Sequence, residues 1–195
     1  MKELESASAL AVRQTKEWAE ILVDFESRNR YSVQDPAGRQ LYWAAEESSL
    51  FWRLLLHTLR PFVMRVFSLA GEPVLRIVKP FRFYFHEAAV YTEAGALLGS
   101  VKREFTLVRK RFTVTDPGGA VLYDINAPIL HPWTFGISRN GAECGQIVKR
   151  WSGLAKESFT DADNFSVVFP PEAGGAHKAL LLGALFLIDM VYFEK

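Results

Sequence analysis

The stretch that decides the fold is residues 179–193, with the sequence ALLLGALFLIDMVYF. It is apolar on every side except at Asp189, so it is predicted to form a helix enclosed by the rest of the chain. A helix of this length rises about 22 Å, whereas the hydrocarbon core of a bilayer is about 30 Å thick. Asp189 would also lie deep in lipid, at a cost of roughly a few kcal/mol. A buried helix is therefore favoured over single-pass insertion into a membrane.

The chain before this helix reads as short strands separated by turn signals. Two turns begin with Asp-Pro and contain glycine, DPAG at residues 35–38 and DPGG at residues 116–119. Strands are predicted at residues 31–34, 40–45, 61–67, 74–78, 83–91, 97–105, 112–115, 121–125, 134–138, 144–151 and 165–169. Eleven or twelve successive strands imply hairpins, and closing them into a barrel removes unpaired edges. We predict a mainly β fold in which a closed antiparallel barrel surrounds the apolar helix.

Composition fits one folded domain. The 15 Phe, 6 Tyr and 5 Trp residues favour strands. The single cysteine, Cys144, excludes an internal disulfide framework and is predicted to be a small core residue. The first residues lack the continuous apolar segment of a secretory signal, which indicates an intracellular setting. We expect residues 1–16 to be a flexible N-terminal segment and residues 17–195 to form the domain.

A second apolar segment, residues 47–60, is predicted to be a helix. Leucine, phenylalanine and tryptophan cover most of its surface, while Arg53, His57 and Arg60 share one face. Such a broad apolar side with basic residues is typical of helices at a membrane interface. A helix that caps one end of the barrel would show the same pattern, so both interpretations stay open.

Charge is distributed unevenly along the chain. Residues 1–50 carry six basic and nine acidic side chains, whereas residues 51–111 carry eleven basic and four acidic ones. This excess suggests an anionic partner for the middle of the chain, either lipid headgroups or nucleic acid. The alternative is that strands simply expose Lys and Arg on their solvated faces.

Two long segments resemble the phospholipid scramblase family. They are KRWSGLAKESFTDADNF at residues 149–165 and KALLLGALFLIDMVYFE at residues 178–194. Shorter matches occur at residues 25–31, 42–47, 60–62 and 79–82, so the resemblance covers residues 17 to 194. The family is similar to the tubby-like and LURP-one-related proteins, which implies a twelve-stranded barrel around the C-terminal helix.

The resemblance also implies a function. It is the calcium-linked, bidirectional transbilayer movement of phospholipids, or at least their binding. The alternative is a non-transporting lipid-binding or phosphoinositide-binding regulatory module of the tubby-like type. Either protein would be cytoplasmic or peripheral at a membrane, with anionic phospholipid headgroups as its partner. Protein partners are not indicated.

The resemblance implies a calcium site within residues 161–172, DADNFSVVFPPE. Asp161, Asp163 and Glu172 could supply carboxylate oxygens, which are the ligands that calcium prefers. A conventional calcium loop is disfavoured, because Ser166 stands where such a loop needs glycine and the alternating residues read as a strand. Turn and capping contacts of Asp161 and Asp163 are the alternative.

The expected membrane contact is the segment at residues 50–59. Scramblase relatives carry cysteine clusters that accept acyl chains, and the corresponding residues 51–56 and 81–86 contain no cysteine. We therefore expect Trp52, Arg53, Leu55 and Arg60 to contact the lipid surface instead.

Catalysis is not expected. No nucleophile elbow, zinc-binding HExxH or phosphate-binding loop occurs, and the four histidines are scattered. The basic and aromatic run at residues 102–112 is compatible with nucleic acid. With a sequence pI of about 7.9, lipid headgroups are favoured over nucleic acid as the anionic partner.

Overall fold

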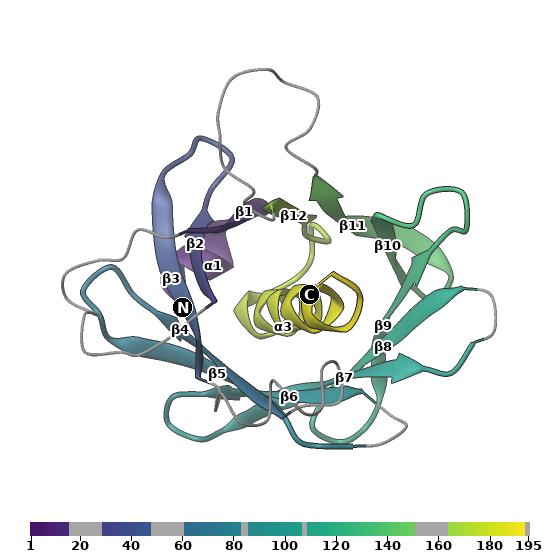
Figure 1. Cartoon of the computed structure of the whole chain (residues 1–195), viewed down its shortest axis with the longest axis horizontal. Coiled ribbons are helices and arrows are strands. Elements are labelled where there is room, and N and C mark those ends of the chain that lie inside the picture. The colour runs from purple at the N-terminus through teal and green to yellow at the C-terminus, as the bar shows by residue number, and fades with distance from the viewer. Residues whose placement is uncertain (16–28, 48–60, 83–85, 107–108, 151–163, 194–195) are drawn as a thin grey trace.

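The computed structural model describes residues 1–15, 29–47, 61–82, 86–106, 109–150 and 164–193. Twelve antiparallel strands form a closed barrel, as predicted, with one long helix along its interior (Figure 1). The strands are β1 (Ala9–Gln14), β2 (Arg30–Gln34), β3 (Gln40–Glu47), β4 (Phe62–Phe67), β5 (Pro73–Lys79), β6 (Glu87–Thr92), β7 (Leu97–Glu104), β8 (Lys110–Thr115), β9 (Val121–Ala127), β10 (Thr134–Arg139), β11 (Ala142–Arg150) and β12 (Asn164–Val168). Within the described residues the helices are α1 (Lys2–Ser6) and α3 (Gly175–Tyr192).

Strand β1 closes the barrel, because it pairs with β12 on one side and with β2 on the other. Its inward residues Leu10 and Val12 are fully buried. Residues 9–14 are therefore part of the barrel wall, although the sequence predicted a flexible segment up to residue 16 and a domain that begins at residue 17. The segment ALAVRQ has little of the β-branched and aromatic character of the other strands. It pairs because two open edges flank it.

The barrel interior is filled by side chains that alternate along each strand. In β9, for example, Tyr123 and Ile125 point inward and are fully buried, while their neighbours are partly exposed. Helix α3 fills the centre of this core, with almost all of its residues buried. Figure 1 shows α3 in the middle of the ring of strands. The predicted burial of the apolar helix is thus confirmed.

Helix α3 runs from Gly175 to Tyr192, so it is longer than the predicted helix at residues 179–193. Its 18 residues rise about 27 Å, so length and composition alone would allow it to cross a membrane. Its mean hydropathy is 1.4, but 78% of it is buried inside the barrel. Burial, not length, therefore distinguishes α3 from a membrane span in this fold.

The two predicted Asp-Pro turns are both present as tight hairpins. Asp35 Oδ1 accepts hydrogen bonds from the backbone N–H groups of Ala37 and Arg39, and Asp116 Oδ1 accepts one from Ala120. Gly119 in the second turn has a φ of 88°, which favours glycine.

The predicted helix at residues 47–60 falls almost wholly outside the described residues. Its first residue, Glu47, belongs to strand β3 and pairs with Val63 of β4. The expectation that Glu47 begins a helix was therefore wrong, because the β3–β4 ladder continues through it.

Candidate functional site

The two ends of the barrel differ in construction. Because neighbouring strands are antiparallel, odd-numbered strands end and even-numbered strands begin at the same end. Helix α3 also ends there, since Lys110 of β8 and Lys149 of β11 both lie over the ring of Phe193. We call this end the carboxyl mouth. At the opposite end, Lys178 in the first turn of α3 donates a hydrogen bond to the backbone carbonyl of Glu5.

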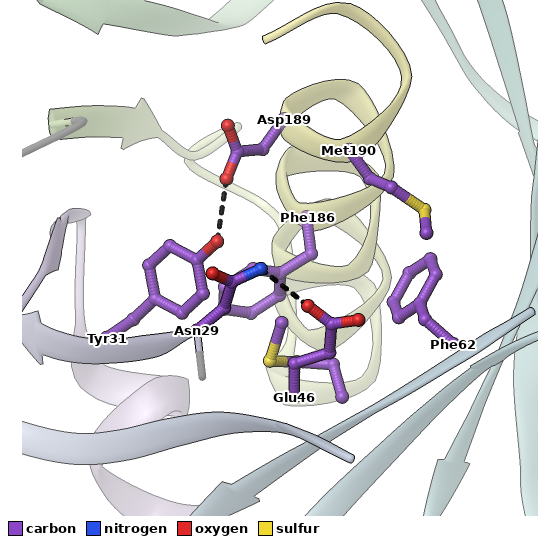
Figure 2. A pocket seen from close by; sticks show the side chains of 8 residues that line it. Asn29, Tyr31, Glu46, Phe62, Phe186, Asp189 and Met190 are labelled. Atoms are coloured by element: carbon purple, nitrogen blue, oxygen red, sulfur yellow. Dashed lines mark hydrogen bonds between the residues drawn. The ribbon is translucent and has the colours of Figure 1, made fainter. Parts of the chain in front are cut away.

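A buried polar cluster surrounds Asp189 near the carboxyl mouth (Figure 2). The Tyr31 hydroxyl donates a hydrogen bond of 2.8 Å to Asp189 Oδ2, and Lys149 Nζ lies 4.0 Å from Oδ1. Nearby, Asn29 Nδ2 donates a hydrogen bond of 2.6 Å to Glu46 Oε2. A small pocket lies between these two pairs and is bounded on its apolar side by Phe62, Phe186 and Met190. The charge that interrupts the apolar helix is thus paired inside the barrel.

Basic side chains surround the end of α3. Lys149 Nζ lies 4.1 Å from the centroid of the Phe193 ring, and Lys110 Nζ lies 4.3 Å from that of Tyr192. Arg103 also lies over Tyr192, at 5.1 Å. Each cation gains from the aromatic face, and all three face the negative end of the helix dipole. Together with Lys79, which is buried at the end of β5, these residues form what we call the basic collar.

The collar residues continue the inward-facing phase of their strands. In β5 the inward residues are Leu75, Ile77 and then Lys79, and in β11 Lys149 follows Ile147 with the same spacing of two. Lys110 similarly precedes inward Phe112 in β8. On β5, β8 and β11 the inner surface of the barrel therefore changes from apolar to basic at its last layer of side chains. Sequence analysis missed this collar, although a lysine in phase with inward apolar residues was a usable signal.

The collar alters the proton affinity of groups beside it. Burial first, and then the charges of Lys79 and Arg103, lower the pKa of His86 to about 4. Burial, with a smaller contribution from Arg103, lowers the pKa of Lys110. His86 is therefore neutral at pH 7, and its Nδ1 has no hydrogen-bond partner among the described residues.

Much of the positive excess in residues 51–111 lies on the outside of the wall. Arg65 pairs with Glu47 at 3.0 Å, and Arg111 pairs with Asp124 at 2.7 Å. These pairs agree with the interpretation that strands expose Lys and Arg on solvated faces. The collar shows that other basic residues of the same region, Arg103 and Lys110 among them, face inward at the mouth instead.

The predicted calcium residues are only partly described. Asp161 and Asp163 lie outside the described residues. Glu172 is described, and it pairs with Arg139 at 3.7 Å beyond the end of β12. The whole of β12, from Asn164 to Val168, runs between Glu172 and the two aspartates. A single calcium loop over residues 161–172 is therefore incompatible with the fold. No cluster of three metal-binding side chains occurs within the described part of the chain.

The predicted membrane-contact residues Trp52, Arg53, Leu55 and Arg60 all lie outside the described residues. The strand ends on either side of them, Glu47 of β3 and Phe62 of β4, are at the carboxyl mouth.

Cys144 and His177 contact residues of the barrel wall, and within the described residues they show no sign of a catalytic arrangement with each other. Cys144 is half-buried against the core, and its Sγ lies 3.5 Å from the carbonyl oxygen of Ile137. Burial raises the pKa of its thiol, which keeps it protonated at pH 7. His177 shares a hydrogen bond of 2.9 Å with the Tyr123 hydroxyl, while His131 is exposed.

Comparison with known proteins identifies a solved structure with a similar fold. A solved X-ray structure of a protein from Arabidopsis thaliana superposes with a TM-score of 0.55 over 95% of this chain and 94% of that one. The two sequences are 16% identical, so this likeness concerns the fold alone.

Sequence relatives are closer. Phospholipid scramblase 1 of Homo sapiens is 29% identical over 98% of this chain, and phospholipid scramblase 2 of Bos taurus is 30% identical over 95% of it. The chain spans 65% of the human protein and 68% of the bovine one. The family model described as Scramblase matches residues 1–195. The protein therefore belongs to the scramblase family.

Proposed function

We propose that this protein moves phospholipids between the leaflets of a bilayer, as the names of its relatives describe. The observation that supports this proposal is the basic collar around the end of a buried apolar helix. Lysine and arginine bind phosphate, and the aromatic rings beside them offer an apolar surface to the rest of a lipid. The collar therefore has the chemistry needed to attract a phospholipid headgroup to the carboxyl mouth.

The test is lipid exchange in proteoliposomes that carry a fluorescent phospholipid in both leaflets. A membrane-impermeant reductant bleaches the outer leaflet alone, so lipid movement appears as bleaching beyond that of protein-free vesicles. We expect additional bleaching with the wild type and less with an Arg103→Gln/Lys110→Gln variant. Arg65→Gln/Arg76→Gln removes the same charge from the outside of the wall, in the middle of β4 and β5, and is the matched control. Bleaching equal to that of protein-free vesicles would reject transbilayer movement.

A second candidate function is lipid binding without transport. The enclosure of α3 favours it, because the wall surrounds this apolar helix and 78% of it is buried. This function predicts that the protein binds vesicles and that soluble headgroup analogues compete with the vesicles for it. Leaflet exchange should stay at the rate of protein-free vesicles. The proteoliposome experiment therefore distinguishes the two candidates.

We further propose that calcium acts through Asp161 and Asp163, completed by oxygens from elsewhere in the fold. Calcium takes six to eight oxygen ligands, and two carboxylates supply at most four. Calorimetry should show calcium binding by the wild type and by Glu172→Gln, whose carboxylate pairs with Arg139 beyond β12. The Asp161→Ala/Asp163→Ala variant should lose it. Unchanged calcium heat in that double variant would remove the site.

Direct lipid contact by Trp52, Arg53, Leu55 and Arg60 remains a separate proposal, based on the amphipathic pattern of their segment. Binding to anionic liposomes should fall in a Trp52→Glu/Leu55→Glu variant. Equal binding by this variant and the wild type would reject the contact.

A further inference from the structure

The two ends of the barrel carry opposite charge. On the side of the carboxyl mouth formed by β5 to β8, the described strand ends and connections from residue 79 to residue 111 include seven basic side chains, Lys79, Arg82, Lys102, Arg103, Arg109, Lys110 and Arg111, and two acidic ones, Glu87 and Glu104. Elsewhere around the same mouth, β2 and β11 add Arg30 and Lys149, while the end of β3 adds Glu46 and Glu47. At the opposite end, the hairpins and the β12–α3 connection contain six acidic side chains, Asp35, Glu72, Glu93, Asp116, Glu143 and Glu172, and two basic ones, Arg39 and Arg139. Among the described residues, charge is therefore polarised along the barrel axis, with the positive excess on the β5–β8 side of the carboxyl mouth.

The carboxyl mouth also exposes large apolar side chains on three neighbouring connections. They are Phe81 (39% exposed) after β5, Phe105 (80%) after β7, and Ile129 (60%), Leu130 (86%) and Trp133 (42%) between β9 and β10. We call these five residues the apolar rim. Strands β5 to β10 are consecutive in the wall, so these connections follow one another around one side of the mouth, about 10 Å apart.

From these two features we propose that the carboxyl mouth is the face that docks on an anionic phospholipid bilayer, with the apolar rim inserted among the headgroups. This proposal rests on the proposed function, to which it adds an orientation. Basic side chains attract an anionic surface, and exposed aromatic and aliphatic side chains gain free energy on leaving water. The opposite end also exposes Leu69, Leu97 and Val121, but its acidic side chains are repelled by the same surface. Both ends expose apolar residues, so it is the difference in charge that identifies the carboxyl mouth as the docking face.

Vesicle flotation tests the orientation. The wild type should float with vesicles of phosphatidylcholine and phosphatidylserine, and less with phosphatidylcholine alone. An Ile129→Glu/Leu130→Glu variant should bind the anionic vesicles with an affinity at least about tenfold lower. Burying a single isoleucine or leucine side chain already contributes about a factor of ten to affinity. Leu69→Glu/Val121→Glu is the matched control at the opposite end, where the exposed fractions are 50% and 60%. It should bind like the wild type.

A second measurement reports the docked face without altering charge. Leu130→Cys and Leu69→Cys, each combined with Cys144→Ser, are labelled with an environment-sensitive fluorophore. Both sites are exposed, so neither label disturbs the core. Anionic vesicles should raise and blue-shift the fluorescence at residue 130 and leave residue 69 unchanged.

The outcomes separate the two proposals. Wild-type binding that the rim variant retains, or a fluorescence rise at residue 69 instead of residue 130, overturns the orientation and leaves the proposed function standing. Failure of the wild type to bind either vesicle overturns both. Loss of binding in the rim variant alone, with the response confined to residue 130, supports the carboxyl mouth as the docking face.

Discussion

Single polar residues inside the barrel are held by specific partners, and Asp189 is the clearest case. The residue is 6% exposed, and its carboxylate accepts a hydrogen bond of 2.8 Å from the Tyr31 hydroxyl. A buried charge that loses such a donor carries its desolvation cost without compensation. The stability of the fold should therefore depend on one hydroxyl group of β2.

The Tyr31→Phe substitution removes this hydroxyl and little else. We expect the free energy of unfolding to fall by about 1–3 kcal/mol, measured by urea denaturation. Tyr91→Phe is the control, because Tyr91 is half-buried on the wall and its ring lies under Arg76. It should change stability by less than about 0.5 kcal/mol. An equal effect of the two substitutions would contradict the importance of the Tyr31–Asp189 bond.

His86 makes stability depend on pH. Its pKa is about 4 in the folded protein and near 6.5 in the unfolded chain. Between these values the unfolded state binds more protons, so the contribution is fully present above about pH 6.5 and is lost as the pH falls towards 4.

The His86→Gln variant should lose less stability than the wild type between about pH 7 and about pH 4. The measurement is the urea midpoint at a series of pH values. His131→Gln removes an exposed histidine and should keep the wild-type profile. Parallel profiles for the wild type and His86→Gln would show that His86 is not the titrating group.

At the scale of elements, the fit of α3 in the barrel is close enough to exclude a methyl group. A Cβ on Gly183 would lie 2.7 Å from Val90 Cγ2, and Val90 is fully buried in β6. In a helix interior, alanine would otherwise be favoured over glycine by about 1 kcal/mol. The close contact between α3 and β6 therefore requires glycine at residue 183, although alanine would be the better helix former.

A Gly183→Ala substitution should lower the free energy of unfolding by about 1–3 kcal/mol through overpacking. Val90→Ala should relieve the clash, so the double variant should lose less than the sum of the two single changes, by at least about 0.5 kcal/mol. Gly174→Ala is the control, because no atom lies within 4 Å of a Cβ there. Additive effects of the two substitutions would show that α3 and β6 do not meet as described.

At the scale of the whole molecule, closure depends on the first strand. Removing residues 1–14 would leave the facing edges of β2 and β12 without a partner. We expect the truncated chain to associate on size-exclusion chromatography and to unfold without a cooperative transition. A peptide of residues 1–15 added in trans should restore the cooperative transition by supplying the missing strand. The same peptide with Leu10 and Val12 replaced by aspartate is the control and should not.

The prediction from sequence was most successful where a pattern repeats within one element. The two-residue alternation of the strands and the all-round apolarity of residues 179–193 predicted a barrel with a helix inside it. The Asp-Pro turns at residues 35–38 and 116–119 were equally readable, because an aspartate side chain and a glycine determine such turns locally.

The tertiary structure decided what depends on partners far apart in the chain. Residues 9–14 have little strand character of their own and become β1 because closure leaves two edges to be filled. Asp189 is tolerated in an apolar helix because Tyr31, 158 residues away, donates to it. The basic collar and the apolar rim draw on strands spread over the chain, and antiparallel pairing alone assembles them at one mouth. The sequence by itself therefore determined the kind of fold and its family resemblance, because local periodicity encodes elements. Long-range packing determined which residues meet at the carboxyl mouth.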